Sequence, residues 1–275
     1  MRIGGKMEKI FEGYTLVSDM DGTLINSKKQ ISKENLDAIK YFVNNGGKFT
    51  VATGRMVASV ACFLDRLNLD LPAILHNGGK IYDYNNKKIV YEHFIEEDRK
   101  EAIRKVWENR PDIGIEIFCD EVVYIYRRCE YTKRYNKYSY DIVYDVPNEI
   151  WNKPWVKVLL IGDEDVLDEF EKEYRNNYDK GTSVRSGANY LDVIGNGTNK
   201  GAGLLKLIEL YNLDKSKIIA VGDNMNDLEM IDIANYGFIL KNGTQRALEK
   251  AKLIAPSNDE NPIKYIIDYV EKNIK

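Results

Sequence analysis

The fold class is decided by one short stretch, Tyr14-Thr15-Leu16-Val17-Ser18-Asp19-Met20-Asp21-Gly22-Thr23-Leu24. Residues 14–18 form a mostly apolar run, which is typical of a strand buried on both faces of a parallel sheet. Asp19 and Asp21 come where this strand ends, and Gly22 allows a tight turn directly after them. Ligands of open parallel α/β sheets bind beyond the carboxyl ends of the strands. The stretch therefore predicts a parallel α/β sheet with a polar site at the end of this strand.

The flanking sequence alternates short apolar strands with amphipathic helices, which indicates a Rossmann-like parallel-sheet core. One helix is expected to begin after Ser32, a good N-cap residue, and to end at Gly46-Gly47. Another is expected to run from the residues after Arg55 to about Leu67. The other expected core elements are strands at 48–52, 73–75, 190–194 and 217–221 and a helix at 201–211.

The texture of the sequence changes from about Asp83, where tyrosines become dense. Residues 83–185 are therefore expected to form an inserted, smaller α/β domain, with residues 1–82 and 186–275 forming the core. The elements expected in the insert are strands at 113–118, 122–126 and 156–161 and helices at 96–108 and 165–174.

Composition narrows the class of protein. A length of 275 residues allows two domains, and a net charge of −3 gives no support for a nucleic-acid or anionic-membrane partner. No apolar run approaches the roughly 20 residues of a membrane helix, and the start lacks the apolar stretch of a signal peptide. Three cysteines without a CxxC pair fit a reducing cytoplasm. The sequence leaves open whether Met1 or Met7 is the natural start.

Residues 127–140 mix basic and aromatic side chains, a composition that also suits stacking on single-stranded nucleic acid. The acidic balance of the chain favours a helix of the insert with a solvated face instead. A third interpretation is that part of this tract faces the substrate pocket.

Four short polar clusters fall at predicted strand ends or ahead of a helix. At the carboxyl edge of a parallel sheet such clusters meet in space, so their convergence indicates one site. The clusters are residues 19–23, Thr53-Gly54-Arg55, Asn199-Lys200-Gly201 and residues 222–227.

The chemistry of these residue types suits phosphoryl transfer. A carboxylate at Asp19 is able to attack phosphorus, and Asp21 beside it is able to protonate the leaving oxygen and then activate water. Mg²⁺, which prefers oxygen ligands, would offset the repulsion between these carboxylates and a phosphate dianion, with Asp223 as a further ligand. Lys200, the Thr53 hydroxyl and backbone amides near Met20 and Gly54 are candidate donors to phosphoryl oxygens.

These clusters, in this order, resemble the motifs of the haloacid dehalogenase superfamily of phosphatases. Residues 19–24 look like its DxDGT motif, Thr53-Gly54-Arg55 like its second motif, Lys200 like its third and residues 222–227 like its GDxxND motif. The long insertion, with residues 76–79 ahead of it, resembles the C2-type (C2B) cap of the Cof-like branch. The resemblance covers nearly the whole chain.

The resemblance implies a role for each matching residue. Asp19 attacks phosphorus, Asp21 is the acid/base and lends its backbone carbonyl to the metal, and Asp223 binds Mg²⁺. Thr53, Gly54, Lys200 and Asn226 hold the phosphoryl group, and Asp227 supports the site. Two departures, Asp192-Val193 where relatives often carry Glu and Gly195 where they often carry Pro, lie outside the catalytic positions.

Several residues keep a plain structural alternative. Asp19 and Asp21 alone would suit a turn, Lys200 alone a solvated surface, and Asn226 and Asp227 a helix N-cap. Arg55 either touches substrate or pairs with a structural carboxylate, and Asn77 either lines the pocket or, with Gly78, only turns the chain. His76 and His93 show no metal-ligand spacing and are interpreted as structural.

The favoured function is a Mg²⁺-dependent hydrolase of small phosphomonoesters, working as a monomer or homodimer through an aspartyl phosphate. Sugar phosphates, nucleotides and phosphorylated flavin or pyridoxal cofactors are the candidate substrates. The sequence leaves two alternatives open, a phosphosugar mutase and a phosphoacceptor or phosphate-binding domain without turnover. Asp21 argues against the second, because receiver domains lack such a partner on the nucleophile's loop.

Overall fold

The computed structural model describes residues 9–137 and 141–274, so the alternative starts at Met1 and Met7 and the end of the 127–140 tract lie outside the described residues. The chain forms two compact units. The first unit contains the described residues within 1–52, 64–73 and 204–275, and the second unit contains those within 53–63 and 74–203. The second unit thus includes more of the chain than the expected insert of residues 83–185.

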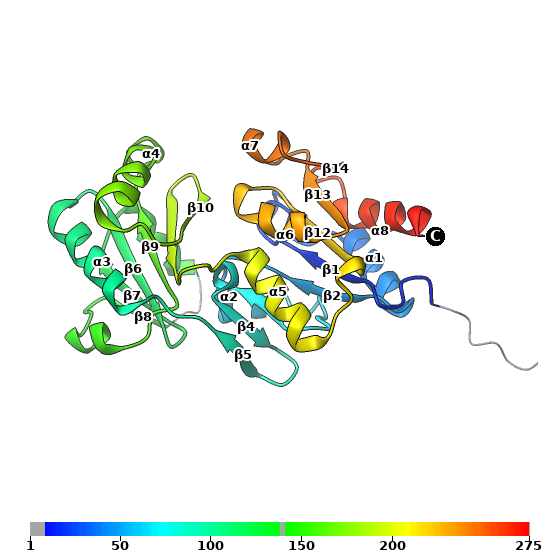
Figure 1. The fold of residues 1–275 in the computed structure, drawn as a ribbon, viewed down its shortest axis with the longest axis horizontal. Helices are drawn as coiled ribbons and strands as arrows, with labels where there is room; N and C mark the ends of the chain where they lie inside the picture. The colour runs from blue at the N-terminus through cyan, green and yellow to red at the C-terminus, as the bar shows by residue number, and fades with distance from the viewer. Residues whose placement is uncertain (1–8, 138–140, 275) are drawn as a thin grey trace, which may run out of the picture. The chain divides into compact units, whose positions relative to one another are not determined.

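The first unit is built on a five-stranded parallel sheet in the order β14-β13-β12-β1-β2, which confirms the predicted α/β class (Figure 1). β1 lies between β2 and β12, and Ser18, the last residue of β1, is level with Val51 and Val221. The ends of these three strands therefore lie at the same edge of the sheet. The strands are β1 (Thr15–Ser18), β2 (Lys48–Val51), β12 (Ile218–Gly222), β13 (Tyr236–Leu240) and β14 (Leu253–Ala255).

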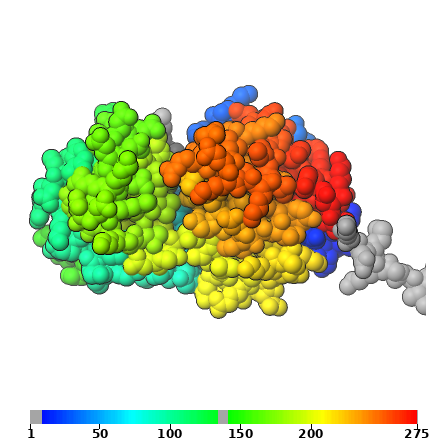
Figure 2. Space-filling view, turned by 45° about the horizontal axis from the view of Figure 1, so that its top comes forward, coloured from blue at the N-terminus to red at the C-terminus, as the bar shows by residue number. Residues whose placement is uncertain are grey.

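Helices α1 and α8 pack together in this unit. The side chain of Ser32 caps α1, as the sequence predicts, and the side-chain oxygen of Asn35 accepts the Ile263 and Lys264 amides at the start of α8. Figure 2 shows the red atoms of α8 beside blue atoms of the N-terminal part of the chain. The helical segments are α1 (Lys33–Asn44), α6 (Leu228–Ile233), α7 (Gln245–Leu248), α8 (Pro262–Asn273), η5 (Lys215–Lys217), η6 (Met225–Asp227) and α5 (Lys200–Tyr211), which begins in the second unit.

The second unit contains a six-stranded sheet in the order β10-β11-β9-β6-β7-β8. The prediction that residues 190–194 form a strand of the catalytic core is wrong in its location, because this strand pairs antiparallel with β9 and β10. An apolar strand pattern shows burial and does not identify the partner sheet, which explains the error. The strands are β6 (Gly114–Cys119), β7 (Val122–Arg127), β8 (Asp141–Val143), β9 (Lys157–Ile161), β10 (Ser183–Gly187) and β11 (Tyr190–Ile194).

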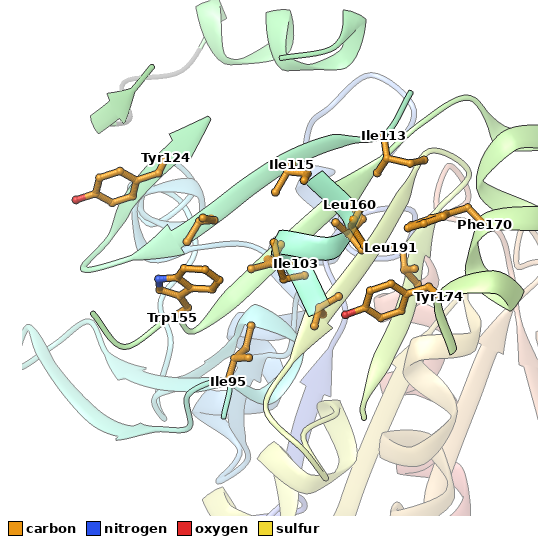
Figure 3. Close-up of a cluster of buried hydrophobic side chains, with 14 of the residues drawn as sticks. Ile95, Ile103, Ile113, Ile115, Tyr124, Trp155, Leu160, Phe170, Tyr174 and Leu191 are labelled. Carbon is orange, nitrogen blue, oxygen red and sulfur yellow. The ribbon is translucent and has the colours of Figure 1, made fainter. Parts of the chain in front are cut away.

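Apolar side chains cover one face of this sheet and form the core of the second unit. Figure 3 shows Ile103 of α3 pointing toward Leu160 and Leu191, which project from two neighbouring strands. The helical segments of this unit are α2 (Val57–Ala61), α3 (Glu97–Asn109), α4 (Glu164–Glu173), η2 (Glu130–Lys137), η3 (Asn148–Asn152) and the π-helical turn η4 (Tyr174–Tyr178). α2 ends well before Leu67, the expected end of that helix, because turns follow it from Cys62 onward.

A chain of aromatic rings runs across the second unit and contains all three tryptophans of the protein. Trp107 lies 5.8 Å from Tyr126, Tyr126 lies 5.4 Å from Trp151, and Trp151 lies 4.9 Å from Trp155, measured between ring centroids. Trp155 is fully buried, whereas Trp107, at the other end, is exposed.

A three-stranded sheet, in the order β3-β4-β5, completes the strands. The 3-10 turn η1 (His76–Gly78) connects its first two strands, and both His76 and Asn77 have left-handed backbone angles there, with φ of 50° and 54°. The strands are β3 (Ala73–Leu75), β4 (Lys80–Asp83) and β5 (Lys88–Glu92).

Candidate active site

Asp19 lies directly after β1, at the centre of the carboxyl edge of the parallel sheet. Its amide donates a hydrogen bond to the Val221 carbonyl at 2.9 Å, which continues the pairing of β1 with β12 by one residue. The side chain is buried, and Met20 beside it is also buried. The sheet therefore fixes Asp19 at a defined position with little freedom of its own.

Asp223 and Asp227 approach Asp19 from the end of β12. One carboxylate oxygen from each of these three residues lies within 4.8 Å of the others. Asp227 is fully buried, and its Oδ2 accepts the Asp223 and Asn224 amides, each at 3.0 Å. The sequence predicted Asp223 as a metal ligand together with Asp19 and assigned Asp227 a supporting role, and the structure brings all three carboxylates together.

The loop after Asp19 fits closely around Asp223. Thr23 donates its hydroxyl to Asp223 Oδ1 at 3.1 Å. Gly22 has φ of 78°, and a Cβ atom built on it would lie 2.5 Å from Asp223 Oδ2. The Asn242 side chain donates to the Gly22 carbonyl at 2.8 Å. Only glycine fits at this position, because both the backbone angle and the space exclude a side chain.

The three carboxylates suit a hard divalent cation. Mg²⁺ prefers oxygen ligands and is typically held by one or two carboxylates together with substrate phosphate. Three carboxylates this close repel one another unless a cation or protons offset their charge. The donor set of Asp19, Asp223 and Asp227 contains oxygen alone, so the residues present fit Mg²⁺.

Asp21 and Asn226 occupy less buried positions in the same unit. Asp21 forms an isolated β-bridge with Ile25, and its residue is exposed, unlike Asp19 two positions earlier. Asn226 lies in η6, where the Asn224 side chain and Asp227 together form a capping box. Asp227 thus caps this turn and also joins the carboxylate cluster, which combines the two interpretations that the sequence left open.

Thr53 begins the second unit, two residues after β2 ends. Its amide donates to the Ile74 carbonyl at 2.8 Å, and its carbonyl accepts the Asn77 amide at 3.0 Å. Its hydroxyl oxygen accepts the Arg55 amide at 3.2 Å. The residue is 1% exposed. These bonds define a tight loop over residues 53–55.

Lys200 is the first residue of α5, and it is 1% exposed. The Asn199 side chain caps this helix start by accepting the Ala202 amide at 2.7 Å. A lysine this buried is not the solvated surface residue that its type alone would indicate. In the second unit, then, Thr53 and Gly54 lie on a short loop ahead of α2, and Lys200 lies at the start of α5.

Arg55 and Asn77, whose roles the sequence left open, both make structural contacts. Arg55 donates to the Ser59 carbonyl at 3.1 Å, and its guanidinium lies 5.2 Å from the centre of the Phe63 ring. Asn77 is buried, and its amide group donates to the carboxylate of Asp192. Asn77 therefore does more than turn the chain.

Lys157 and Asp192 are contact residues of this loop that sequence reasoning missed. Lys157 Nζ donates to the Gly54 carbonyl at 3.0 Å and lies 3.6 Å from Asp192 Oδ1. Burial raises the pKa of the Asp192 carboxyl above its ordinary value, and the Lys157 charge acts in the opposite direction. The only signal in the sequence is Asp192 itself, a position at which relatives often carry Glu.

Among the described residues, no helix is long and apolar enough to cross a membrane.

Comparison with known proteins identifies the family. A family model described as haloacid dehalogenase-like hydrolase matches residues 16–267. The Bacillus subtilis (strain 168) protein named 5-amino-6-(5-phospho-D-ribitylamino)uracil phosphatase YwtE is 27% identical over 286 aligned positions, covering 91% of this chain and 95% of that protein. A second protein of that organism with the same activity name, YcsE, is 28% identical over 246 positions, covering 89% of this chain and 90% of its own.

Solved structures agree in fold. A haloacid dehalogenase-like hydrolase from Bacteroides thetaiotaomicron superposes with a TM-score of 0.79 at 24% identity, covering 94% of this chain and 99% of that one. The chain belongs to the haloacid dehalogenase-like hydrolase family, which confirms the resemblance seen in the motifs. It is an enzyme, and within this family it is a phosphatase.

Proposed function

We propose that this enzyme is a Mg²⁺-dependent phosphatase that hydrolyses small phosphomonoesters through an aspartyl phosphate on Asp19. The observation that carries the proposal is the carboxylate cluster of Asp19, Asp223 and Asp227 at the end of the central strands. Asp21 on the same loop supplies the second carboxyl that hydrolysis needs. A structural turn would not require three carboxylates within 4.8 Å of one another.

Asp19 and Asp223, with the backbone carbonyl of Asp21, are the proposed holders of Mg²⁺. Asp227 stands close enough to share this role, although its Oδ2 already accepts two amides. When bound, the ion supplies positive charge that allows a phosphate dianion to approach Asp19.

Two displacements at phosphorus make up the reaction. In the first, an Asp19 carboxylate oxygen bonds to phosphorus while the bond to the leaving oxygen breaks, and the Asp21 carboxyl gives its proton to that oxygen. In the second, Asp21 takes a proton from water, the water oxygen bonds to phosphorus, and the Asp19 carboxylate is released. The exposed position of Asp21 suits this role, because it must reach both the leaving group and solvent water.

Phosphoryl oxygens need donors, and the proposed ones are the Thr53 hydroxyl, the Gly54 amide, Lys200 and Asn226. The Thr53 hydroxyl oxygen accepts the Arg55 amide, and a hydroxyl in this position is able to donate its own proton to a phosphoryl oxygen. Fixed donors of this kind stabilise the charge that develops in the transition state.

Substrate choice is proposed to reside in the inserted residues 83–185. Two relatives are named as phosphatases of 5-amino-6-(5-phospho-D-ribitylamino)uracil, and a structural neighbour is described as a sugar phosphatase of subclass IIB. A panel of phosphorylated metabolites assayed for phosphate release should begin with this ribityl phosphate. Sugar phosphates, nucleotides and phosphorylated flavin and pyridoxal cofactors complete the panel.

The mechanism is tested by separating the two carboxylates by role. Asp19→Asn should form no phosphoenzyme with any substrate, because a neutral amide is a poor nucleophile. Asp21→Asn should form phosphoenzyme from p-nitrophenyl phosphate, whose leaving group needs no proton, and then stall. With an alkyl phosphate Asp21→Asn should fail at the first step, losing about 10² to 10⁴ in rate.

Acid-quenched mass spectrometry of each variant after mixing provides the measurement. Phosphate on Asp21 in the unaltered enzyme, or on no aspartate under any condition, would overturn the proposal. Activity of Asp19→Asn within tenfold of the unaltered enzyme would do the same.

A further inference from the structure

The segment that follows Thr53 is held at both of its ends by charged side chains from the six-stranded sheet. At one end, Lys157 of β9 donates its Nζ to the Gly54 carbonyl at 3.0 Å. At the other, Glu121, in the turn between β6 and β7, accepts the Val57 amide on its Oε2 at 3.1 Å. All of these residues belong to the second unit.

The surroundings of Lys157 fix its position. The residue is 6% exposed, its Nζ lies 4.5 Å from the centre of the Phe118 ring, and Asp192 Oδ1 lies 3.6 Å away. Asn77 donates to the other oxygen of Asp192. A buried cation with a carboxylate, a carbonyl and an aromatic ring around it has little freedom to move.

The bond from Lys157 reaches Thr53 through a single peptide group. The Gly54 carbonyl that accepts from Lys157 shares its peptide plane with the Arg55 amide, which donates to the Thr53 hydroxyl oxygen at 3.2 Å. A fixed peptide plane therefore holds the Arg55 amide in place against the Thr53 hydroxyl oxygen. We infer that this contact orients the Thr53 hydroxyl.

Glu121 supplies a side-chain acceptor for the first turn of α2, which the N-cap residue of that helix does not provide. Met56, the N-cap residue of α2, makes no side-chain capping bond, so the Val57 amide depends on Glu121. Asp120 and Glu121 both have left-handed backbone angles, with φ of 52° and 61°, in a turn that usually uses glycine or asparagine. Lys80, which is buried between Glu92 at 2.9 Å and Glu121, holds this carboxylate in place.

We propose that Lys157 and Glu121 are positioning residues of the phosphatase reaction. Together they hold residues 54–57 so that the Thr53 hydroxyl and the neighbouring amides keep the geometry that binds a phosphoryl group. The inference rests on the proposed function, because it assigns these residues to the loop that we propose binds phosphate.

Lys157→Met tests the first contact, because methionine keeps most of the apolar stem and removes the donor. The KM for p-nitrophenyl phosphate and the inhibition constant of inorganic phosphate should each rise about tenfold, the loss expected from one charged hydrogen bond. The kcat should change less than KM. Lys157→Arg, which retains a donor and the charge, should recover part of the loss.

Lys100→Met is the matched control for a buried lysine. Lys100 is 3% exposed, donates to the Trp151 and Lys153 carbonyls, pairs with Glu97 and lies 5.0 Å from the centre of the Trp155 ring. Its replacement should lower the melting temperature as Lys157→Met does and leave the inhibition constant of phosphate within twofold.

Glu121→Ala tests the second contact independently, and its side chain is 33% exposed, so the variant is expected to fold even if Lys157→Met does not. Glu92→Ala is its control, because it also removes a carboxylate from Lys80 and leaves the Val57 amide untouched. Glu121→Ala should raise the inhibition constant of phosphate several-fold, and Glu92→Ala should not.

Equal effects of a test variant and its control would show a merely structural role and overturn the inference, as would an unchanged inhibition constant in Glu121→Ala. In either case phosphate release by the unaltered enzyme would leave the proposed function standing. If the unaltered enzyme neither hydrolyses p-nitrophenyl phosphate nor binds inorganic phosphate, the proposed function and the inference both fall.

Discussion

Gly22 shows how closely the carboxylate cluster is packed. Gly22→Ala would place a Cβ atom 2.5 Å from Asp223 Oδ2 and impose φ of 78° on alanine. The left-handed backbone alone costs about 1–2 kcal/mol. We expect Gly22→Ala to lose that much stability and also to lose more than tenfold in phosphatase activity, because Asp223 must move.

Gly13→Ala is the control for this prediction. Gly13 has φ of 81°, and its Cβ would meet only the flexible end of Lys217, at 3.4 Å. Denaturant unfolding should therefore show similar losses for the two variants, with activity retained in Gly13→Ala alone. A fully active Gly22→Ala would show that the position of Asp223 is unimportant.

The buried His76 is expected to make the stability of the protein depend on pH. Burial and the charges of Lys157 and Lys80 lower the pKa of His76 well below its ordinary value of 6.5, and neither ring nitrogen has a hydrogen-bond partner among the described residues. The Glu121 Oε1 atom lies 4.0 Å from Nε2 of this ring. The folded enzyme thus keeps His76 neutral under conditions in which the unfolded chain takes up a proton.

The direction of the pH dependence of stability follows from the lower pKa of His76 in the folded protein. The contribution of His76 to stability is complete above pH 6.5 and is lost as the pH falls toward the folded-state pKa, by about 1 kcal/mol per pH unit. The melting temperature should therefore fall between pH 7 and pH 5 less steeply in His76→Asn, which tolerates the left-handed backbone, than in the unaltered enzyme. His93→Asn, at a partly exposed histidine, is the control, and equal slopes in all three proteins would contradict the prediction.

The residues of the candidate site differ in how far the sequence predicted them. Asp19, Asp21 and Asp223 lie in short motifs at strand ends, where local order and spacing indicate a shared site. Lys157 and Glu121 lie in no motif, and about 100 and 65 positions separate them from the Gly54 and Val57 backbone groups that they contact. Contacts of this kind arise only when strands from distant parts of the chain pair, and one sequence carries no pattern that indicates them.

At the scale of elements, Arg99 ties α3 to the sheet of the second unit, because its Nη1 donates to the Ile194 carbonyl of β11 at 2.5 Å. Its Nε donates to Asp179 at 2.9 Å, and Nη2 donates to the Thr182 carbonyl at 2.9 Å. Both ions are nearly buried, and Tyr174 donates to the same carboxylate. Removing one member leaves the other charge buried without its counterion, which typically costs about 3–5 kcal/mol.

We therefore expect Arg99→Met to lower the free energy of unfolding by about that amount. Arg104→Met, in the same helix, should cost about 1 kcal/mol or less, because Arg104 is half-exposed and makes a surface ion pair with Glu101 and a ring contact with Trp151. Urea unfolding measures both. A loss for Arg99→Met no larger than that for Arg104→Met would show that the buried pair is not a major support of the unit.

The sequence predicted most of the helices and strands, but it predicted less well which strands pair with one another. The strand at β1, the cap of α1 by Ser32 and the helix at α5 follow from apolar spacing and capping residues. β11 was predicted as a strand and assigned to the wrong sheet, since burial on both faces is common to strands of either sheet. Local pattern determines the type of an element, and pairing depends on the rest of the chain.

At the scale of the whole molecule, metal binding should affect the stability of the fold. A ligand that binds the folded state alone stabilises it by about 2.7 kcal/mol at one hundred times its dissociation constant. Mg²⁺ should raise the melting temperature of the unaltered enzyme, a chelator should reverse the rise, and Asp223→Asn should abolish it. Asp232→Asn, at an exposed aspartate of α6, should retain it.

An equal Mg²⁺-dependent rise in Asp223→Asn would place the ion elsewhere. Full phosphatase activity after exhaustive metal removal would contradict the proposed dependence on Mg²⁺.

The chain of aromatic rings gives the second unit an intrinsic tryptophan fluorescence signal. Because all three tryptophans belong to the second unit, tryptophan emission reports on that unit and not on the first unit. Buried Trp155 and exposed Trp107 should emit at different wavelengths, so the spectrum carries two signals from opposite ends of one aromatic chain. Without any added label, rapid-mixing fluorescence on addition of substrate would record the response of the unit that contains residues 83–185, to which we assign substrate choice.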